Sequence, residues 1–559
     1  MKIFLSQQNY HIGNFEANTT KIIADIKRAK EQGGDLIVFS ELAVCGYPPR
    51  DFLEFEDFIA ECLKAIDIIK QAADTIGVLV GAPSRNTNAE GKNLFNSAYL
   101  LYENDIKGII HKTLLPTYDI FDEYRYFEPG YQWNVLHFKG KKLAVTICED
   151  IWNIGENPLY RISPMDMLID LKPDLMINLS ASPFDYLHAD GRRSIVIENV
   201  RKYHLPIIYC NATGSQTEIV FDGGSVVMDA DENIVTTLPY FEEALQYVVF
   251  NDNGTFTPGE INTTITPLAH SNPGIFDAHQ GTDVIHRALI TGIRDYFNKM
   301  GFTKAIVASS GGIDSAVVLA LACEALGAGN VRALLMPSQF STDHSVADAV
   351  QLSQNLDSPY DILPIKDIFE TFATTLEPVF KDLPFSIAEE NLQSRIRGAL
   401  VMALSNKFGS ILLNTSNKSE LATGYGTLYG DMAGGLGVLG DLYKMQVYAM
   451  ANYLNRNGEI IPQNIINKPP SAELRPGQKD SDSLPDYEVL DGILYQYIER
   501  RQGPKEIIAL GNDTALVNRI LKLVNTNEYK RNQFCPIIRV SPKAFGIGRR
   551  VPIVGKYLS

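Results

Sequence analysis

The most constraining feature of this sequence is a short polar turn between two apolar runs. The strand-like run Lys304–Ala308 leads into Ser309–Ser315, which reads Ser-Ser-Gly-Gly-Ile-Asp-Ser, and the helical run Ala316–Leu326 follows. Gly311 and Gly312 let the backbone come close to an anion, and the following helix adds its positive N-terminal end. The order of strand, glycine-containing turn and helix therefore predicts an α/β domain with a phosphate site.

The polar side chains of this turn agree with a phosphate site. The hydroxyls of Ser310 and Ser315 can donate hydrogen bonds to phosphate oxygens, and Asp314 makes sense beside phosphates chiefly as a magnesium ligand. The sequence contains no Gly-x-x-x-x-Gly-Lys-Ser/Thr string, so this is not a Walker-type loop. The alternative is a plain Gly-Gly turn with a helix cap.

The string Ser-Gly-Gly-x-Asp-Ser at Ser310–Ser315 resembles the mark of the ATP pyrophosphatase family. Members of that family bind the ATP triphosphate in this loop, adenylate a substrate and release pyrophosphate. The resemblance implies a doubly wound parallel sheet, a magnesium ion at Asp314, and an ATP site made of Ser309, Ser310, Gly311, Gly312, Ile313, Asp314 and Ser315.

A second glycine-rich string, Gly435–Gly440, matches the dinucleotide fingerprint Gly-x-Gly-x-x-Gly. The fingerprint requires an apolar strand immediately before it, and here Tyr429–Ala433 takes that place. We therefore predict a loop at Gly435–Gly440.

The first half of the chain alternates helical and strand-like runs, which predicts another α/β domain. The N-terminal stretch Met1–Asn9 is apolar for only three residues, so we expect a strand rather than a signal-peptide core, and a cytoplasmic protein. Turn formers crowd residues 251–275. We therefore predict domains at 1–250 and 276–559 with a linker at 251–275. Buried strands are expected at 35–39, 76–80, 143–147, 175–179 and 206–209.

Composition excludes several classes of partner. Fifty Lys and Arg against sixty-six Asp and Glu give a net charge of −16, which argues against a nucleic-acid coat. The longest apolar stretch, Ala316–Leu326, contains Glu324 and is too short to span a membrane. Six cysteines without a Cys-x-x-Cys pair support neither a disulfide framework nor a zinc site.

Three residues of the first half suggest nucleophilic catalysis. Glu41, Lys112 and Cys148 each stand just past the carboxyl end of an apolar run, where α/β sheets place their sites. A carboxylate can act as the base for a thiol, and an ammonium can stabilise a thiolate or an oxyanion. Taken singly, Cys148 also fits a buried small side chain, and Glu41 and Lys112 fit solvated charges.

With their flanks, Glu41–Pro49, Lys112–Pro116 and Cys148–Trp152, these residues resemble the nitrilase-type amidases. The resemblance implies an αββα sandwich over residues 1–250. It also implies that Glu41 is the general base, that Cys148 is the nucleophile that forms a thioester, and that Lys112 stabilises the tetrahedral intermediate.

Taken together, the two halves resemble the glutamine-dependent NAD synthetases almost from end to end. Distinctive second-half strings are Glu390–Gly398, Asn414–Glu420, Gly424–Asp431, Pro469–Pro476 and Glu528–Arg531. The resemblance implies glutamine, ATP with magnesium, and deamido-NAD (nicotinic acid adenine dinucleotide) as ligands, and a homo-oligomer, a dimer or larger. It assigns Thr415 to ATP, and Asn391, Glu420 and Lys530 to deamido-NAD.

For glutamine, the resemblance implies contacts from Tyr118, Ser182 and a basic residue six positions after Ser182. That position holds His188 where the family typically has lysine, so the basic contact falls to His188, Arg192 or Arg193. A second departure is Gly548, where the family pattern has Asp.

Two rival interpretations stay open at this stage. One is another amidotransferase on the same ATP pyrophosphatase core, and the other is a binding protein that senses glutamine or NAD precursors without turnover. One long segment, Asn464–Tyr487, is rich in proline and charge. We expect it to form no packed helix or strand and to act as a lid.

Overall fold

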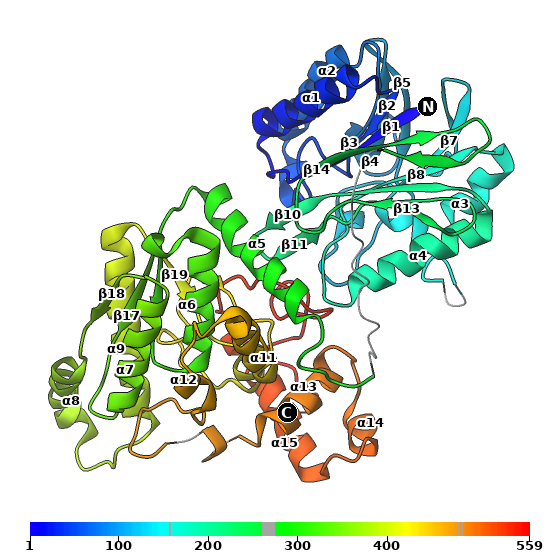
Figure 1. Ribbon diagram of the computed structural model, residues 1–559. Coiled ribbons are helices and arrows are strands. Elements are labelled where there is room, and N and C mark those ends of the chain that lie inside the picture. Colours follow the sequence, from blue (N-terminus) through cyan, green and yellow to red (C-terminus); the bar gives the residue numbers. More distant parts are fainter. Residues whose placement is uncertain (156–157, 260–273, 479, 483, 559) are drawn as a thin grey trace. The chain divides into compact units, whose positions relative to one another are not determined.

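The computed structural model describes residues 1–155, 158–259, 274–478, 480–482 and 484–558, without the side chains of His188 and Asp343. It forms two compact units (Figure 1). The first contains the elements from β1 to β15, and the second contains α5 to α16 together with Asp185–Leu187. Within the described ranges, no helix has the length and apolarity needed to cross a membrane.

The first unit has two sheets. One is seven-stranded, in the order β15-β14-β1-β2-β3-β4-β5, and the other is six-stranded, in the order β13-β12-β9-β8-β7-β6. The first sheet comprises β1 (Lys2–Gln7), β2 (Leu36–Val38), β3 (Gly77–Arg85), β4 (Leu94–Tyr102), β5 (Asp105–His111), β14 (Ala244–Phe250) and β15 (Phe256–Pro258). The second comprises β6 (Leu136–Phe138), β7 (Lys141–Ile147), β8 (Leu175–Ser180), β9 (Ile207–Asn211), β12 (Val226–Met228) and β13 (Ile234–Thr237). The hairpin of β10 (Thr213–Gln216) and β11 (Ile219–Asp222) and the helices α1 (Phe15–Glu31), α2 (Glu56–Ala72), α3 (Pro164–Leu168) and α4 (His188–Tyr203) complete the unit.

The layers of this unit follow from strands that are apolar on both faces. Along β1, Leu5 packs between the sheets with Val145 of β7, whereas Phe4 turns outward to Ile22 of α1. The helices α1 and α2 cover the outer face of the first sheet, and α3 and α4 cover the outer face of the second (Figure 1). Strands buried on both sides read as continuous apolar runs, which is why the sequence reveals them. The predicted αββα sandwich is confirmed.

The second unit is built on a five-stranded parallel sheet in the order β18-β17-β16-β19-β20. The strands are β16 (Ala305–Ala308), β17 (Val331–Leu335), β18 (Tyr360–Ile362), β19 (Ile411–Asn414) and β20 (Leu436–Gly437). The strands on one side of β16 are β17 and β18, whereas the chain later returns to its other side with β19 and β20. The topological switch point therefore lies between β16 and β19, and open α/β sheets bind their ligands at such a point. The helices are α5 (Thr282–Met300), α6 (Ile313–Leu326), α7 (Asp343–Asn355), α8 (Lys366–Phe380), α9 (Ile387–Phe408), α10 (Lys418–Thr423), α11 (Lys444–Leu454), α12 (Gln463–Asn467), α13 (Tyr487–Ile498), α14 (Pro504–Ala509), α15 (Thr514–Thr526) and α16 (Glu528–Arg531).

Helices pack on both faces of this sheet. Ile396 and Val401 of α9 pack on Ile306 and Leu412 on one face. The helix α6, apolar on nearly every side, is buried against the other face, where it also contacts α5 and α11. The predicted doubly wound parallel sheet is therefore confirmed.

Two local predictions were wrong. The string Gly435–Gly440 is not entirely a loop, because Leu436–Gly437 forms β20 and pairs in parallel with β19 at the sheet edge. The proline-rich segment contains regular structure as well, because α12 buries Ile465. The carboxylate of Asp480 is buried too, where it accepts hydrogen bonds from two tyrosine hydroxyls that the sequence pattern does not reveal.

Candidate active sites

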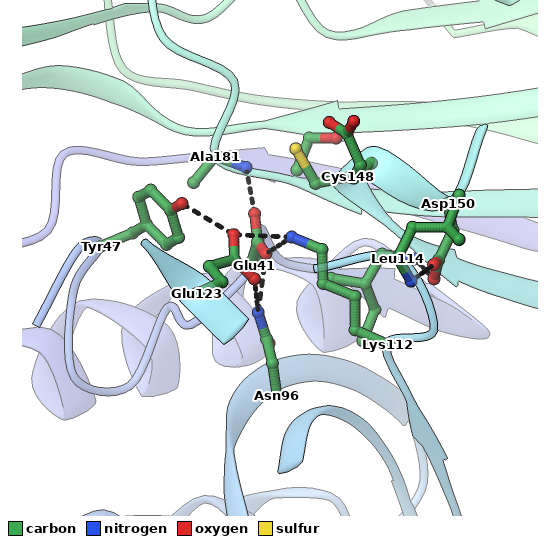
Figure 2. A network of polar contacts seen from close by, with 12 residues as sticks. Glu41, Tyr47, Asn96, Lys112, Leu114, Glu123, Cys148, Asp150 and Ala181 are labelled. Carbon is green, nitrogen blue, oxygen red and sulfur yellow. Dashed lines mark hydrogen bonds and ion pairs between the residues drawn. The ribbon is translucent and has the colours of Figure 1, made fainter. Parts of the chain in front are cut away.

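The structure brings Glu41, Lys112 and Cys148 together in the first unit (Figure 2). They follow β2, β5 and β7, and the Nζ of Lys112 donates to Oε1 of Glu41 at 2.7 Å. Both side chains of this ion pair are fully buried. Cys148 has a φ of 42°, in the left-handed region that non-glycine residues rarely adopt. A nucleophile held in such a strained turn is typical of an active site.

A second carboxylate, which sequence reasoning missed, completes this group. Glu123 accepts a hydrogen bond from Lys112 Nζ at 2.8 Å and another from the hydroxyl of Tyr47 at 2.7 Å. Asn96 donates to Glu41 at 2.8 Å and to Glu123 at 3.3 Å. One ammonium therefore lies between two carboxylates. Burial and the nearby Glu41 raise the pKa of Glu123 to about 7, although Lys112 opposes this.

Burial and these charges both act on the Cys148 thiol. Burial and the carboxylate of Glu41 raise the pKa of the Cys148 thiol well above its ordinary value, with Lys112 acting in the opposite direction. Burial alone would lower the pKa of Lys112, but Glu123 and Glu41 raise it above its usual range. The resting pair is thus a neutral thiol beside a permanent ammonium. A neutral thiol needs a base to take its proton before it can act as a nucleophile.

Asp150 links the segment that contains Cys148 to the segment that follows Lys112 through hydrogen bonds. Its carboxylate accepts from the backbone N–H groups of Thr113 at 3.0 Å, Leu114 at 2.8 Å and Ile147 at 3.0 Å. Burial raises the pKa of Asp150 to about 7, although these hydrogen bonds oppose the shift. Because one side chain binds the ends of both segments, Cys148 and Lys112 keep fixed positions relative to each other.

The predicted glutamine contacts lie on the same unit. The hydroxyl of Tyr118 donates to the buried carboxylate of Glu149, the residue after the nucleophile, at 2.9 Å, and Tyr160 donates to it at 3.0 Å. The backbone N–H of Ser182 donates to Asn211 at 2.9 Å. His188 opens α4, and its side chain lies outside the described ones.

The alternative basic residue Arg192 is already engaged. Its buried guanidinium makes two hydrogen bonds, of 2.9 and 2.7 Å, to the carboxylate of Asp222. Breaking a buried bidentate pair is costly, so Arg192 is committed to the core of its own unit. Arg193 is exposed.

The second unit contains a cavity of about 280 Å³ at the switch point of its sheet. It lies at the carboxyl ends of β16, β17 and β19. The predicted ATP residues Ser309, Ser310, Gly312, Ile313, Asp314, Ser315 and Thr415 line it, and so does Glu420.

The turn after β16 has the geometry of an anion cradle. Gly311 has a φ of 80°, and the hydroxyl of Ser310 lies 3.2 Å from that of Ser315. The buried hydroxyl of Ser309 has no hydrogen-bond partner among the described residues. Hydroxyls and N–H groups clustered at the start of α6 suit phosphate oxygens.

Asp314 is surrounded by polar side chains of the next segments. Lys444 donates to one oxygen of its carboxylate, and Asn417 donates to the other at 2.8 Å. Lys444 also lies 3.5 Å from Glu420, whose pKa is raised to about 8 by burial and by Asp314, with Lys444 opposing. Magnesium is held by one or two protein carboxylates together with substrate phosphates. The oxygens of Asp314 and Glu420 fit that requirement. Sequence reasoning missed Lys444 and Asn417.

Two predicted dinucleotide contacts do not line this cavity. Lys530 donates to the carbonyl oxygens of Gly424 at 2.7 Å and Gly426 at 2.8 Å. Asn391 accepts from the hydroxyl of Thr427 at 2.8 Å. Both residues therefore hold the loop from Gly424 to Thr427, which follows α10.

The fold and these sites define a thiol amidase joined to a nucleotide-binding α/β ligase unit. Comparison with family models agrees, since residues 2–252 match the carbon-nitrogen hydrolases and residues 285–534 match NAD synthase.

The same relatives match both units at once. The glutamine-dependent NAD(+) synthetase of Synechocystis sp. is 43% identical over 99% of this chain and 98% of its own length. That of Thermotoga maritima is 40% identical over 100% and 99%. The solved structure of the Acinetobacter baumannii enzyme in complex with ADP is 37% identical, with a TM-score of 0.76 over 99% of this chain and 98% of that one. The chain belongs to the glutamine-dependent NAD(+) synthetases.

Proposed function

We propose that this chain carries out its family's reaction with one chemistry in each unit. The predicted glutaminase domain, residues 1–250, is extended in the first unit by β15 (Phe256–Pro258) and releases ammonia from glutamine. Residues 276–559 use this ammonia to convert deamido-NAD to NAD. ATP is cleaved to AMP and pyrophosphate, and glutamate is released. One observation carries the proposal: a buried Glu-Lys-Cys group and a Ser-Gly-Gly-x-Asp-Ser turn occur in the same chain.

In the first unit, Glu41 takes the proton of the Cys148 thiol as the sulfur attacks the carboxamide carbon of glutamine. Lys112 stabilises the oxyanion of the tetrahedral intermediate. The amide nitrogen leaves as ammonia with the proton held by Glu41, and a thioester remains. Water, deprotonated by Glu41, then attacks the thioester, which releases glutamate and returns the proton to the sulfur.

Glutamine also carries an α-ammonium and an α-carboxylate that need partners. Glu149 is the suitable anion for the ammonium, because its carboxylate is buried beside the nucleophile and is oriented by Tyr118 and Tyr160. Ser182 and His188 take the carboxylate in this proposal.

In the second unit, the turn Ser309–Ser315 and Thr415 bind ATP. The carboxylate of deamido-NAD attacks the α-phosphorus, pyrophosphate leaves, and the resulting acyl adenylate is attacked by ammonia to give NAD and AMP. A magnesium ion, when bound, neutralises phosphate charge. Asp314 would hold it, with Glu420, which lies 3.5 Å from the same Lys444 ammonium, as a second carboxylate.

Deamido-NAD is held in this proposal by Asn391, Glu420 and Lys530. Glu420 lines the cavity, and the other two fix the loop Gly424–Thr427 beside it. The proposal further includes a homo-oligomer, a dimer or larger, in the cytoplasm. It includes no nucleic-acid or membrane partner, as expected from a chain of net charge −16.

The decisive experiment supplies the purified protein with ATP, magnesium, glutamine and deamido-NAD. We expect NAD, AMP and glutamate in equal amounts. AMP formation only with a different carboxylate acceptor would indicate another amidotransferase, and binding without any turnover would indicate a sensor. Either result would overturn the proposal.

A further inference from the structure

Three cationic side chains line the synthetase cavity within the described part of the chain, and they differ in their partners. Lys444 is paired with Asp314, and Lys468 is paired with Glu473 at 2.6 Å. Arg397 instead makes a single hydrogen bond, from Nε to the carbonyl oxygen of Met336 at 2.9 Å.

The remaining N–H groups of Arg397 have no described partner. A guanidinium carries five donors, and the two amino groups form the fork that binds carboxylates and phosphates. The nearest carboxylates are engaged elsewhere, since Asp431 accepts from the backbone N–H of Thr427 at 2.6 Å and Glu473 is paired with Lys468. No carboxylate among the described residues lies within ion-pair distance of this guanidinium.

Such an arrangement is costly in the absence of a ligand. Arg397 projects from α9 into the cavity, and burial lowers its pKa to about 10, with Asp431 and Glu473 only partly opposing the shift. The Arg397 side chain is half-buried, so the cavity walls reduce its hydration without supplying a counter-ion. An anionic ligand would supply the missing partner.

The position of Arg397 near the phosphate turn indicates that this anion is a phosphate group. Met336, which anchors its Nε, directly follows β17. The phosphate turn is tied to the same strand, because the N–H of Ser309 donates to the carbonyl oxygen of Leu334 at 2.9 Å. The guanidinium therefore stands at the same edge of the sheet as the turn Ser309–Ser315.

We propose that Arg397 binds a phosphate group of a nucleotide in the synthetase cavity through the free fork of its guanidinium. This inference rests on the proposed use of that cavity for ATP and deamido-NAD, and it adds a residue that the sequence resemblance did not provide. Both nucleotides carry phosphates, so the experiment must distinguish between them.

The test compares Arg397→Met with the wild type and with Lys407→Met, a charge-loss control at an exposed position of the same helix. Titration calorimetry measures the binding of ATP, inorganic pyrophosphate and deamido-NAD separately. We expect Arg397→Met to raise the Kd of one of the two nucleotides by about 10- to 100-fold, the range for the loss of charge-assisted hydrogen bonds. If the binding of pyrophosphate and of ATP is weakened together, the ligand of Arg397 is the triphosphate of ATP. If only the binding of deamido-NAD is weakened, the ligand is a phosphate of the dinucleotide.

Thermal unfolding separates ligand binding from a structural role. Without ligand, Arg397→Met should unfold at the wild-type temperature or higher, because it removes an uncompensated charge. The rise in unfolding temperature caused by the affected nucleotide should shrink, and Arg397→Lys, which keeps the charge without the fork, should recover it only in part.

Two results would overturn the inference. One is unchanged binding of all three ligands by Arg397→Met, and the other is a lower unfolding temperature of the ligand-free variant with no selective loss of binding. If the wild type itself bound neither nucleotide, the proposed function of the cavity would fail instead, so the two failures are distinguishable.

Discussion

Replacing Gly311 by alanine tests the phosphate turn at a single atom. Gly311 has a φ of +80°, and a Cβ built there would lie 2.2 Å from the carbonyl oxygen of Ser345 in α7. The left-handed conformation costs an alanine about 1–2 kcal/mol. The clash is with backbone, so no side-chain rotation can relieve it.

The expected loss of activity follows from the distance that the turn must move to relieve the clash. An ordinary carbon–oxygen contact needs about 1 Å more than the 2.2 Å available at Gly311, and a displacement of about 1 Å in a preorganised site can cost about 10²-fold in rate. We therefore expect kcat/KM for ATP in ammonia-driven NAD synthesis to fall by about 10²-fold. The unfolding free energy should fall by at least about 1–2 kcal/mol, because the clash adds to the strain of the left-handed conformation.

The assay measures NAD formation from deamido-NAD and ammonium chloride at varied ATP. Gly329→Ala is the matched control, because a Cβ there meets nothing within 4 Å and the backbone is not in the left-handed region. Alkylation of Cys148 by a thiol reagent, as fast as in the wild type, shows that the first unit is intact. A Gly311→Ala variant with the same kcat/KM as the control would refute the assignment of this turn to ATP phosphates.

Three further predictions concern the division of labour and the proline-rich segment. Cys148→Ala should abolish glutamine hydrolysis and glutamine-driven NAD formation while ammonia-driven synthesis continues, measured as NAD with either nitrogen source; loss of both in a folded variant would contradict separate sites. Asp314→Asn should abolish synthesis from both nitrogen sources yet leave Cys148 reactive to alkylation, since it removes the carboxylate proposed to hold magnesium; normal ammonia-driven turnover at saturating ATP and magnesium would disprove the metal assignment. The residues Lys468–Leu474 of the proline-rich segment line the cavity, so ATP with deamido-NAD should slow amide exchange there, and glutamine alone should not; equal exchange with and without those nucleotides would make the segment an ordinary connector.

Much of the fold could be read from local sequence patterns. Apolar runs buried on both faces predicted the strands β2, β3, β7, β8 and β9. The secondary-structure and burial predictions were wrong where a strand is very short or where a polar side chain is buried by hydrogen bonds to other segments. The strand β20 has two residues and no apolar run. The carboxylate of Asp480 is buried and accepts hydrogen bonds from Tyr425, 55 residues away, and from Tyr487 at the start of the next helix.

The sequence by itself determined which residues stand at strand ends, because a strand, its turn and the next helix are encoded within a few consecutive residues. It could not determine which side chains meet there. Lys444 pairs with Asp314 across 130 positions, and Glu123 joins Lys112 through the path of an irregular loop. Asn391 and Lys530 hold a loop beside the cavity rather than lining it. Such meetings depend on the register and packing of distant segments, and a local pattern contains no information about either, so only the tertiary structure decided them.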